Sequence, residues 1–361
     1  MKKSVAALEA YQAEKPVETI KAEYGLDSLA RLSANESVYG PSPKVKEAIQ
    51  AALATDLGYY PDGQATSLRQ AVAELDQVAE DNLVFGVGAD EIIQLLTRVV
   101  LESGQNIVIP DPTFGEYAIH AQIEQAETKR VAVFPETGGV DFEALAAAVD
   151  DQTAMVWLAN PNNPTGVFES PTDIQVFLDQ LDPSVVLVVD EAYIDFVDQA
   201  DKTVAPLVAD YSNLVVLRTL SKAYGLANLR IGYGIIADPL WTAMQAVRLP
   251  YNLSTLQIAG GTAAVLDQDY VQGNIEKIRV ERAKFEAFLA ANEIPFYPSQ
   301  ANFVWVKVGD APQVGQDLLE AGFQINKRLN PEWVRITLGR PEENERLQEA
   351  LLQALRLGDS K

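Results

Sequence analysis

The sequence predicts an α/β fold in which a large domain with a mainly parallel sheet of six or seven strands precedes a second, smaller α/β domain. From about residue 83, short β-branched runs alternate with helical patterns. The runs are apolar throughout, which is typical of parallel strands that are covered by helices on both faces. A chain of 361 residues also exceeds what one hydrophobic core usually serves, so two lobes are expected.

The elements of the large domain follow one another in strict alternation. We expect strands at 82–88, 106–112, 129–134, 154–161, 184–193, 213–222 and 231–238, and helices at 89–104, 114–126, 141–150 and 171–181. A long helical pattern at 271–293 then leads to two further strands, at 301–308 and 332–339. The pattern changes near residue 250, which predicts an amino-terminal arm (1–30), a large domain (31–250) and a small domain (251–361).

Composition excludes several classes of function. The formal net charge is -23 and no basic block interrupts it, which argues against a surface that binds nucleic acid or anionic lipid. The chain has no cysteine, so disulfides, thiolate zinc sites and cysteine nucleophiles are excluded. Its single histidine, His120, lies in a helical pattern, and we interpret it as structural. We therefore expect no metal site and no Ser-His-Asp catalysis.

The first residues do not resemble a targeting segment. MKKSVAALEAYQAEKP has two lysines, but Glu9 interrupts its apolar run, and no later segment reaches the roughly 18 apolar residues of a membrane span. These features predict a soluble cytoplasmic protein.

Two chemically active side chains follow strands of the predicted sheet. Open α/β sheets bind ligands beyond the carboxyl ends of their strands. Lys222 lies just after NLVVLRTLS, where apolar neighbours favour a neutral, nucleophilic amine, although a lone lysine in a loop is more often a surface residue. Asp190 ends the apolar run SVVLVV, and its buried carboxylate needs a cation, a helix to cap or a salt bridge. Together, the amine and the carboxylate are the pair that pyridoxal phosphate requires.

Two loops at the same edge are ambiguous by themselves. GVGADE, which ends at Glu91, precedes a helix, so the backbone N–H groups of Ala89 and Asp90 could bind a phosphate, but ordinary helix capping prefers the same residues. NNPTG has the composition of a tight turn, and Asn163 within it could also donate to a ligand oxygen.

A resemblance covers nearly the whole chain and joins these fragments. The order of LSANESVYGPSP, YYPDG, GVGADE, DPTFGEY, NPNNPTG, DEAY, TLSKAYGLANLRIGYG, ANFVWV and VRITLG resembles the fold-type-I pyridoxal-phosphate-dependent aminotransferases, and most closely the histidinol-phosphate aminotransferases. Each motif is weak alone, whereas their joint order is very specific.

The resemblance implies pyridoxal 5'-phosphate as cofactor and assigns its contacts. It implies that Lys222 forms the internal aldimine, that Asp190 pairs with the pyridine nitrogen, and that Tyr193 and Asn163 hold the phenolic oxygen. Phe114 would stack on the ring, at a position where relatives often have tyrosine. The other implied cofactor contacts are Thr219 and, at the phosphate, Ser221, Arg230 and the backbone of Ala89 and Asp90.

The resemblance also implies a homodimer, because Tyr60 of YYPDG would reach the cofactor phosphate of a second subunit. Arg335 would bind the anionic groups of both substrates, and Tyr11 and Asn35 would close over the same pocket. The implied reaction converts histidinol phosphate and 2-oxoglutarate to imidazole-acetol phosphate and glutamate, in histidine biosynthesis. Lys222, Asp190 and Tyr193 are the expected catalytic residues.

Two residues depart from the family pattern. Asn326 occupies a place where many relatives have a second arginine, followed here by Lys327 and Arg328, so recognition of the substrate phosphate is expected to be shifted. Asn228 replaces a glycine, and because asparagine tolerates a left-handed backbone, the turn is expected to persist.

Other functions stay open at this point. An aromatic amino-acid aminotransferase shares the same motifs, and a threonine-phosphate decarboxylase is a more distant relative. A ligand-sensing regulator on the same fold would need a basic DNA-binding module, for which this chain has no room. A nucleotide-binding α/β protein is disfavoured because GVGADE lacks both the GxGxxG spacing and a Walker lysine.

Overall fold

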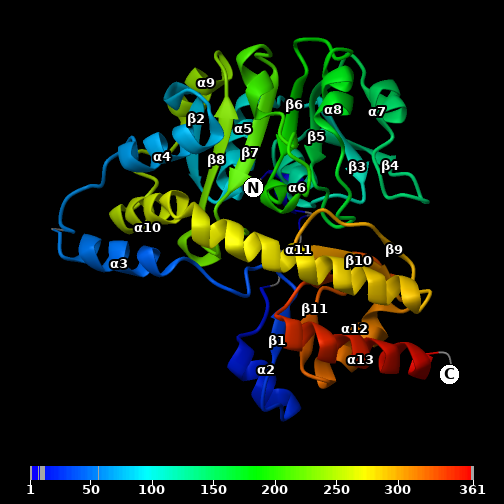
Figure 1. Cartoon of the computed structure of the whole chain (residues 1–361). Coiled ribbons are helices and arrows are strands. Elements are labelled where there is room, and N and C mark those ends of the chain that lie inside the picture. The colour runs from blue at the N-terminus through cyan, green and yellow to red at the C-terminus, as the bar shows by residue number, and fades with distance from the viewer. Residues whose placement is uncertain (1, 7, 9–12, 56, 359–361) are drawn as a thin grey trace.

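The computed structural model describes residues 2–6, 8, 13–55 and 57–358, and one seven-stranded sheet lies at its centre (Figure 1). The strand order is β2-β8-β7-β6-β5-β3-β4, and every neighbouring pair is parallel except the two that involve β8. The strands are β2 (Leu83–Val87), β3 (Asn106–Asp111), β4 (Glu127–Ala132), β5 (Thr153–Ala159), β6 (Val186–Asp190), β7 (Leu214–Thr219) and β8 (Ile231–Ile236). The prediction of an α/β fold with a mainly parallel sheet is confirmed.

Helices cover both faces of this sheet, which explains why its strands are apolar throughout. Successive side chains of a strand point to opposite faces, so Leu187 and Val189 of β6 enter one hydrophobic cluster and Val186 and Val188 enter another. Helices on one face are α5 (Ala89–Val100), α6 (Glu116–Ile123) and α9 (Leu240–Val247), and those on the other are α4 (Thr66–Asp76), α7 (Phe142–Ala148) and α8 (Pro171–Leu178). Four short 3-10 turns are η1 (Glu80–Asn82), η2 (Ile194–Phe196), η3 (Ala205–Ala209) and η4 (Ala227–Leu229).

Two helices connect the large sheet to the carboxyl-terminal part. Ser254 and Gln257 form a reciprocal capping box at the start of α10 (Thr255–Leu266), and α10 packs on α3 (Pro43–Leu53) and α4. The 24-residue helix α11 (Gln268–Ala291), about 36 Å long, then runs across the molecule to the smaller sheets (Figure 1). Neither α3, α4 nor α10 was among the predicted elements.

The smaller part contains two short sheets. A three-stranded antiparallel sheet has the order β12-β10-β9, with β9 (Phe296–Tyr297), β10 (Phe303–Lys307) and β12 (Trp333–Thr337), and it packs with α12 (Ala311–Glu320) and α13 (Pro341–Gly358). Near the amino terminus are α1 (Lys3–Ala6), α2 (Val17–Tyr24) and β1 (Ala30–Leu32), and β1 pairs in parallel with β11 (Phe323–Ile325). This pairing brings the residues just after β1 next to β12.

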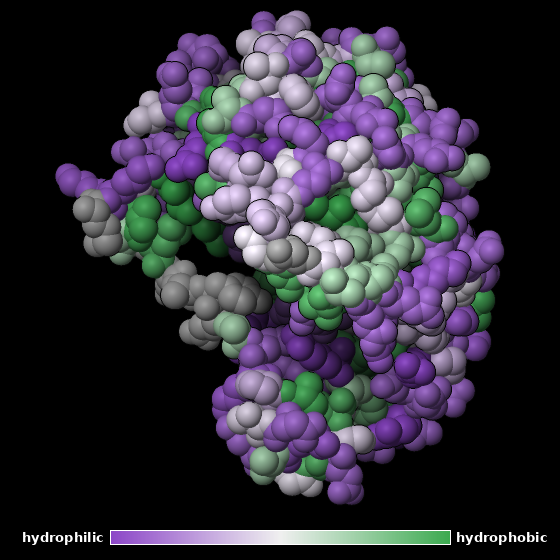
Figure 2. All heavy atoms as spheres, turned by 90° about the vertical axis from the view of Figure 1, so that its left-hand side faces the viewer, coloured by the Kyte–Doolittle hydropathy of each residue, from purple (hydrophilic) through white to green (hydrophobic). Residues whose placement is uncertain are grey.

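The two parts leave a hollow between them. Figure 2 shows the face that lies at the left of Figure 1, where the surface is deeply recessed between the larger upper part and the smaller lower part. No helix within the described residues combines the length and the apolar character that a membrane crossing requires. The same residues contain no group of three or more His, Cys, Asp or Glu side chains that could ligate a metal ion.

Candidate active site

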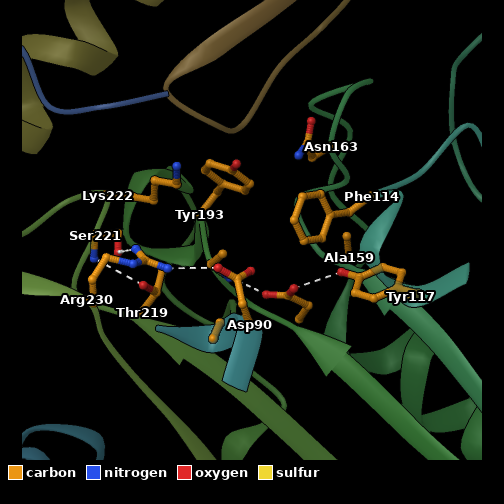
Figure 3. Close-up of a pocket in the computed structure, with 13 residues that line it drawn as sticks. Asp90, Phe114, Tyr117, Ala159, Asn163, Tyr193, Thr219, Ser221, Lys222 and Arg230 are labelled. Carbon is orange, nitrogen blue, oxygen red and sulfur yellow. Dashed lines mark hydrogen bonds and ion pairs between the residues drawn. The ribbon is translucent and has the colours of Figure 1, made fainter. Parts of the chain in front are cut away.

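A cavity of about 170 Å³ lies at the carboxyl edge of the parallel strands (Figure 3). The last residues of three adjacent strands, Ala159 of β5, Asp190 of β6 and Thr219 of β7, line it together with the first turn of α5. The full lining is Ala89, Asp90, Phe114, Tyr117, Ala159, Asn163, Asp190, Ala192, Tyr193, Thr219, Ser221, Lys222 and Arg230. Residues far apart in the sequence therefore meet where a parallel sheet is expected to bind a ligand.

Asp190 is a buried carboxylate, with only 5% of its surface exposed. Its Oδ2 accepts a hydrogen bond from the Tyr117 hydroxyl at 2.8 Å, and its Oδ1 accepts one from the Ala192 backbone N–H at 3.1 Å. Burial nevertheless raises the pKa of Asp190 to about 6, because two neutral donors do not fully replace water. A cation placed in the cavity against this carboxylate would be strongly stabilised.

Tyr117, which donates the hydrogen bond to Asp190, belongs to a cluster of aromatic side chains. Its ring is fully buried, stacks on Trp157 at a centroid distance of 4.6 Å and meets Phe114 edge-on at 5.6 Å. Phe114 itself projects from the loop after β3 into the cavity (Figure 3). The side of the cavity next to Asp190 is therefore aromatic and suited to a flat ring.

Lys222 brings an amine to the same cavity. Its Nζ donates to the backbone oxygen of Ala34 at 2.9 Å. Burial, with a smaller contribution from the positive charge of Arg335, lowers the pKa of Lys222 to about 8. Close to neutral pH a useful fraction of this amine is uncharged and nucleophilic.

The amino end of α5 and Arg230 form an anion cradle on another side of the cavity. The first turn of α5 has no side-chain cap hydrogen bond, so its first backbone N–H groups are available to an anion, and Ala89 and Asp90 of this turn line the cavity. Arg230 Nη2 contacts Asp90 at 2.8 Å and its Nη1 contacts Ser221 Oγ at 3.4 Å. Gly88 has a φ of 79°, which favours glycine, and a Cβ atom there would also lie 2.4 Å from Arg230 Nη2 and displace the guanidinium.

The turn that carries Arg230 differs from the expectation for Asn228. The turn expected at Asn228 is present as the 3-10 turn η4, but Asn228 does not have the positive φ that the expectation invoked. Arg230 instead has a φ of 53°, a strained conformation for a residue with a Cβ. Its backbone oxygen accepts from the Gly88 N–H at 3.0 Å, which ties the arginine to the start of α5.

The remaining wall of the cavity is joined to the smaller part of the protein. The Tyr193 hydroxyl accepts a hydrogen bond from Asn35 Nδ2 at 2.9 Å, and burial raises the pKa of Tyr193. Asn163 Oδ1 accepts from Arg335 Nη1 at 2.6 Å. A second hydrogen bond from Arg335 reaches the backbone oxygen of Ser33 at 2.6 Å. Arg335 is thus a buried cation directly behind Asn163.

The structure places the other predicted residues outside this lining. Asn35 is buried, and both ends of its amide are engaged by Tyr193 and Thr337 rather than turned toward an open pocket. Tyr60 is 81% exposed and stacks on Tyr251 at 4.7 Å, away from the cavity of its own chain. Tyr11 lies outside the described residues. His120 lies on α6, 3.7 Å from Glu116, and burial lowers its pKa.

Asn326 lies beside Arg335. The two residues exchange backbone hydrogen bonds of 3.1 and 2.9 Å, and Asn326 Oδ1 accepts from the N–H of Arg328. Asn326, Lys327 and Arg328 line a second, open hollow of about 780 Å³.

Sequence reasoning missed Tyr117, Ala159, Ala192 and, behind the cavity, Thr337. Tyr117 had a usable signal, since it follows Phe114 by three residues at the start of a helix and shares its face. Thr337 contributes through a hydrogen bond to Asn35, which lies 302 positions earlier in the sequence, so no local pattern indicates it.

Comparisons with known proteins agree on one family. The family model "Aminotransferase class I and II" matches residues 28–351. A histidinol-phosphate aminotransferase of Leuconostoc mesenteroides is 68% identical over 354 residues, which cover 98% of this chain and 99% of that protein. One of Leuconostoc citreum is 62% identical over 352 residues, covering 98% and 99% of the two chains. The crystal structure of a histidinol-phosphate aminotransferase from Sinorhizobium meliloti, in complex with pyridoxal-5'-phosphate, superposes with a TM-score of 0.89 at 29% identity and covers 99% of this chain and 97% of that one.

Proposed function

The chain belongs to the aminotransferase class I and II family, and we propose that it is a pyridoxal-phosphate-dependent histidinol-phosphate aminotransferase. The reaction that we propose converts histidinol phosphate and 2-oxoglutarate to imidazole-acetol phosphate and glutamate; the names of the relatives support histidinol phosphate as the substrate. One structural observation carries the proposal. The buried carboxylate of Asp190 and the amine of Lys222, separated by 31 residues in the sequence, line one cavity beside an anion cradle.

The residues of the cavity fit pyridoxal 5'-phosphate. Burial disfavours the charged form of Asp190, and the protonated ring nitrogen would give its carboxylate a cationic partner. Phe114 would lie against the ring. The amino end of α5, Ser221, Thr219 and Arg230 would bind the phosphate, while Asn163 and Tyr193 would hold the ring oxygen. When bound, the cofactor supplies an electrophilic carbon for the amino group and a ring that withdraws electrons from the substrate carbon.

Lys222 and Asp190 divide the chemical work. Lys222 Nζ would hold the cofactor between turnovers, and afterwards take a proton from the substrate carbon and return it on the product side. Its lowered pKa of about 8 suits both directions of this transfer near neutral pH. Asp190 would keep the ring nitrogen protonated throughout, and Tyr117 would keep the Asp190 carboxylate oriented toward that nitrogen.

Arg335 would bind the anionic groups of both substrates. Its guanidinium is buried, and the two hydrogen bonds described above go to neutral oxygens, those of Asn163 and Ser33. A carboxylate that approaches Asn163 would meet paired N–H donors in the geometry it accepts best. Tyr11 and Asn35 are proposed to close over the same substrate pocket.

We further propose a homodimer in which Tyr60 reaches the phosphate cradle of the second subunit. The segment between α3 and α4 and the loop before α10 expose many large apolar side chains: Leu53, Leu57, Tyr59, Tyr60, Leu249 and Tyr251. Large exposed apolar side chains that gather on one surface often mark an interaction site. A second copy would cover them and complete each site with a tyrosine hydroxyl from its neighbour.

Two further expectations remain proposals. The division into an arm (1–30), a large domain (31–250) and a small domain (251–361) is supported by the separate sheets, although α10 packs back on α3 and α4. The proposed place of action is the cytoplasm, where amino-acid biosynthesis draws its substrates.

Steady-state kinetics tests the substrate. The cofactor-loaded protein is assayed with 2-oxoglutarate as acceptor and with either histidinol phosphate or phenylalanine as donor. The proposal expects a higher kcat/KM for histidinol phosphate. A higher value for phenylalanine would overturn the substrate and leave the aminotransferase chemistry in place.

A further inference from the structure

A chain of three hydrogen bonds runs from β12 to the catalytic wall of the cavity. The backbone N–H of Asn35 donates to Thr337 Oγ1 at 3.0 Å, and the Thr337 hydroxyl contacts Asn35 Oδ1 at 2.9 Å. Asn35 Nδ2 then reaches the Tyr193 hydroxyl at 2.9 Å. Asn35 and Thr337 are each only 1% exposed, so water does not compete for these atoms.

The directions of the three hydrogen bonds in this chain are consistent with one another and start from one fixed donor. A backbone N–H can only donate, so Thr337 Oγ1 accepts from Asn35 N. The Thr337 hydroxyl hydrogen then goes to Asn35 Oδ1, so the amide oxygen of Asn35 faces Thr337; a reversed amide would make Thr337 Oγ1 accept a second hydrogen and leave its own hydrogen without this acceptor. The amide NH₂ consequently faces Tyr193 and donates to its oxygen.

The consequence concerns the hydrogen of Tyr193. An amide NH₂ cannot accept, so the Tyr193 hydroxyl cannot direct its hydrogen at Asn35. The phenolic oxygen accepts from Asn35, and its own hydrogen is left for an acceptor in the cavity that Tyr193 lines. In the free protein the chain therefore presents a donor to the cavity before any ligand arrives.

Other contacts keep Asn35 and Tyr193 in this arrangement. Asn35 has a φ of 55°, a left-handed conformation that asparagine adopts more readily than most residues, and Asn302 Nδ2 donates to its backbone oxygen at 3.1 Å. Phe303 of β10 pairs with Thr337 of β12, and its ring packs edge-on against Tyr193 at 5.0 Å. The ring of Tyr193 thus packs on the carboxyl-terminal sheet, and its hydroxyl is linked to that sheet through Asn35.

We propose that Asn35 and Thr337 are positioning residues that orient the Tyr193 hydroxyl as a hydrogen-bond donor toward the ring oxygen of the cofactor. The inference rests on the proposed function, because it needs a cofactor with an oxygen at this place. Asn35 then acts on the cofactor indirectly, by orienting the Tyr193 hydroxyl. Thr337 acts one step further away, by orienting the amide of Asn35.

The proposal makes the light absorption of the loaded protein depend on Thr337. A donor at the ring oxygen stabilises negative charge there, so losing the donor raises the proton affinity of the chromophore formed with Lys222. The pH midpoint of the visible absorbance change is measured for the wild type and for Thr337→Val, Thr337→Ser and Tyr193→Phe. Thr337→Val keeps the shape of the side chain but removes its hydroxyl, whereas Thr337→Ser retains the hydroxyl.

Thr337→Val should raise the midpoint by roughly half a pH unit or more, in the same direction as Tyr193→Phe, and Thr337→Ser should stay near the wild type. In the Tyr193→Phe background, Thr337→Val should cause no further shift. The proposal would be overturned if Thr337→Val left the midpoint unchanged. It would also be overturned if Thr337→Val caused the full shift in the Tyr193→Phe background, where the hydroxyl is absent. If the wild type shows no visible band at all, the proposed function fails instead, which is a different outcome.

Asn35→Asp provides a second route if Thr337→Val does not fold. A carboxylate accepts hydrogens from both Thr337 and Tyr193, so it would draw the Tyr193 hydrogen away from the cavity. The midpoint should rise, and the rise should be smaller in the Tyr193→Phe background, where only the added charge acts. Equal rises in both backgrounds would contradict the proposal.

Discussion

The Tyr117 hydroxyl donates a 2.8 Å hydrogen bond to Asp190 Oδ2 at the end of β6. This contact is fully buried, and it opposes the effect of burial on the pKa of Asp190. Tyr117→Phe removes the donor and leaves the ring stack on Trp157 intact. Because a hydrogen bond to a charged group contributes about 1.5–3 kcal/mol, cofactor affinity should fall by roughly tenfold or more.

Equilibrium dialysis of the cofactor measures this loss. Tyr211→Phe is the matched control, since it removes a Tyr–Asp hydrogen bond of 2.6 Å to Asp179 on the exposed surface. Equal affinities for Tyr117→Phe and the wild type would show that Tyr117 does not support the Asp190 carboxylate.

Asp190 should destabilise the cofactor-free protein as the pH rises. Its pKa is about 6 in the folded protein, above the ordinary aspartate value of 3.8, so the folded state disfavours the charged form. The resulting cost is absent below about pH 4, grows between pH 4 and 6, and stays constant above that. Asp190→Asn should therefore increase the free energy of unfolding at pH 8 by up to about 3 kcal/mol and have little effect at pH 4.

Urea unfolding of the cofactor-free protein at several pH values checks this sign. Asp201→Asn, at an exposed position, is the control and should change little at any pH. A destabilising effect of Asp190→Asn at pH 8 would mean that the charged carboxylate already has a compensating partner in the empty cavity.

Arg335→Lys should weaken substrate recognition while it leaves the cofactor in place. Lysine keeps the charge but cannot present the paired donors that arginine directs at Asn163 and Ser33. The kcat/KM for glutamate should fall by about tenfold to a hundredfold, mainly through KM. An exposed replacement, Arg98→Lys, is the control. Unchanged kinetics in Arg335→Lys would place the substrate carboxylate elsewhere.

Mixed dimers test whether Tyr60 acts across a subunit interface. Tyr60→Ala and Lys222→Ala chains are each expected to have little activity as pure proteins. If Tyr60 serves the neighbouring site, a hybrid dimer contains one site with both defects and one intact site, so co-expression should restore about a quarter of the wild-type activity. Tyr59→Ala, also exposed, is the control and should remain active alone. Hybrid dimers without restored activity would show that Tyr60 does not complete the partner's site.

The strand ends were the part of the site that the sequence could predict. Lys222 and Asp190 follow apolar runs, and parallel strands bring such positions to one edge, so local patterns and one topological rule suffice. The arrangement of Asn35 and Thr337 could not be predicted this way. It depends on the pairing of β1 with β11, which joins residues about 300 positions apart. The positive φ falls at Arg230 and not at Asn228, and the local sequence pattern does not indicate this.

Identification of the modified lysine tests the proposed chemistry most directly. The purified protein is loaded with pyridoxal 5'-phosphate and treated with borohydride, and its peptides are then sequenced by mass spectrometry. The amine that lines the cavity together with Asp190 should carry the label, so the modified peptide should contain Lys222 and the Lys222→Ala protein should yield no labelled peptide. A label on another lysine, or none on the wild type, would contradict the assignment of this cavity as the cofactor site.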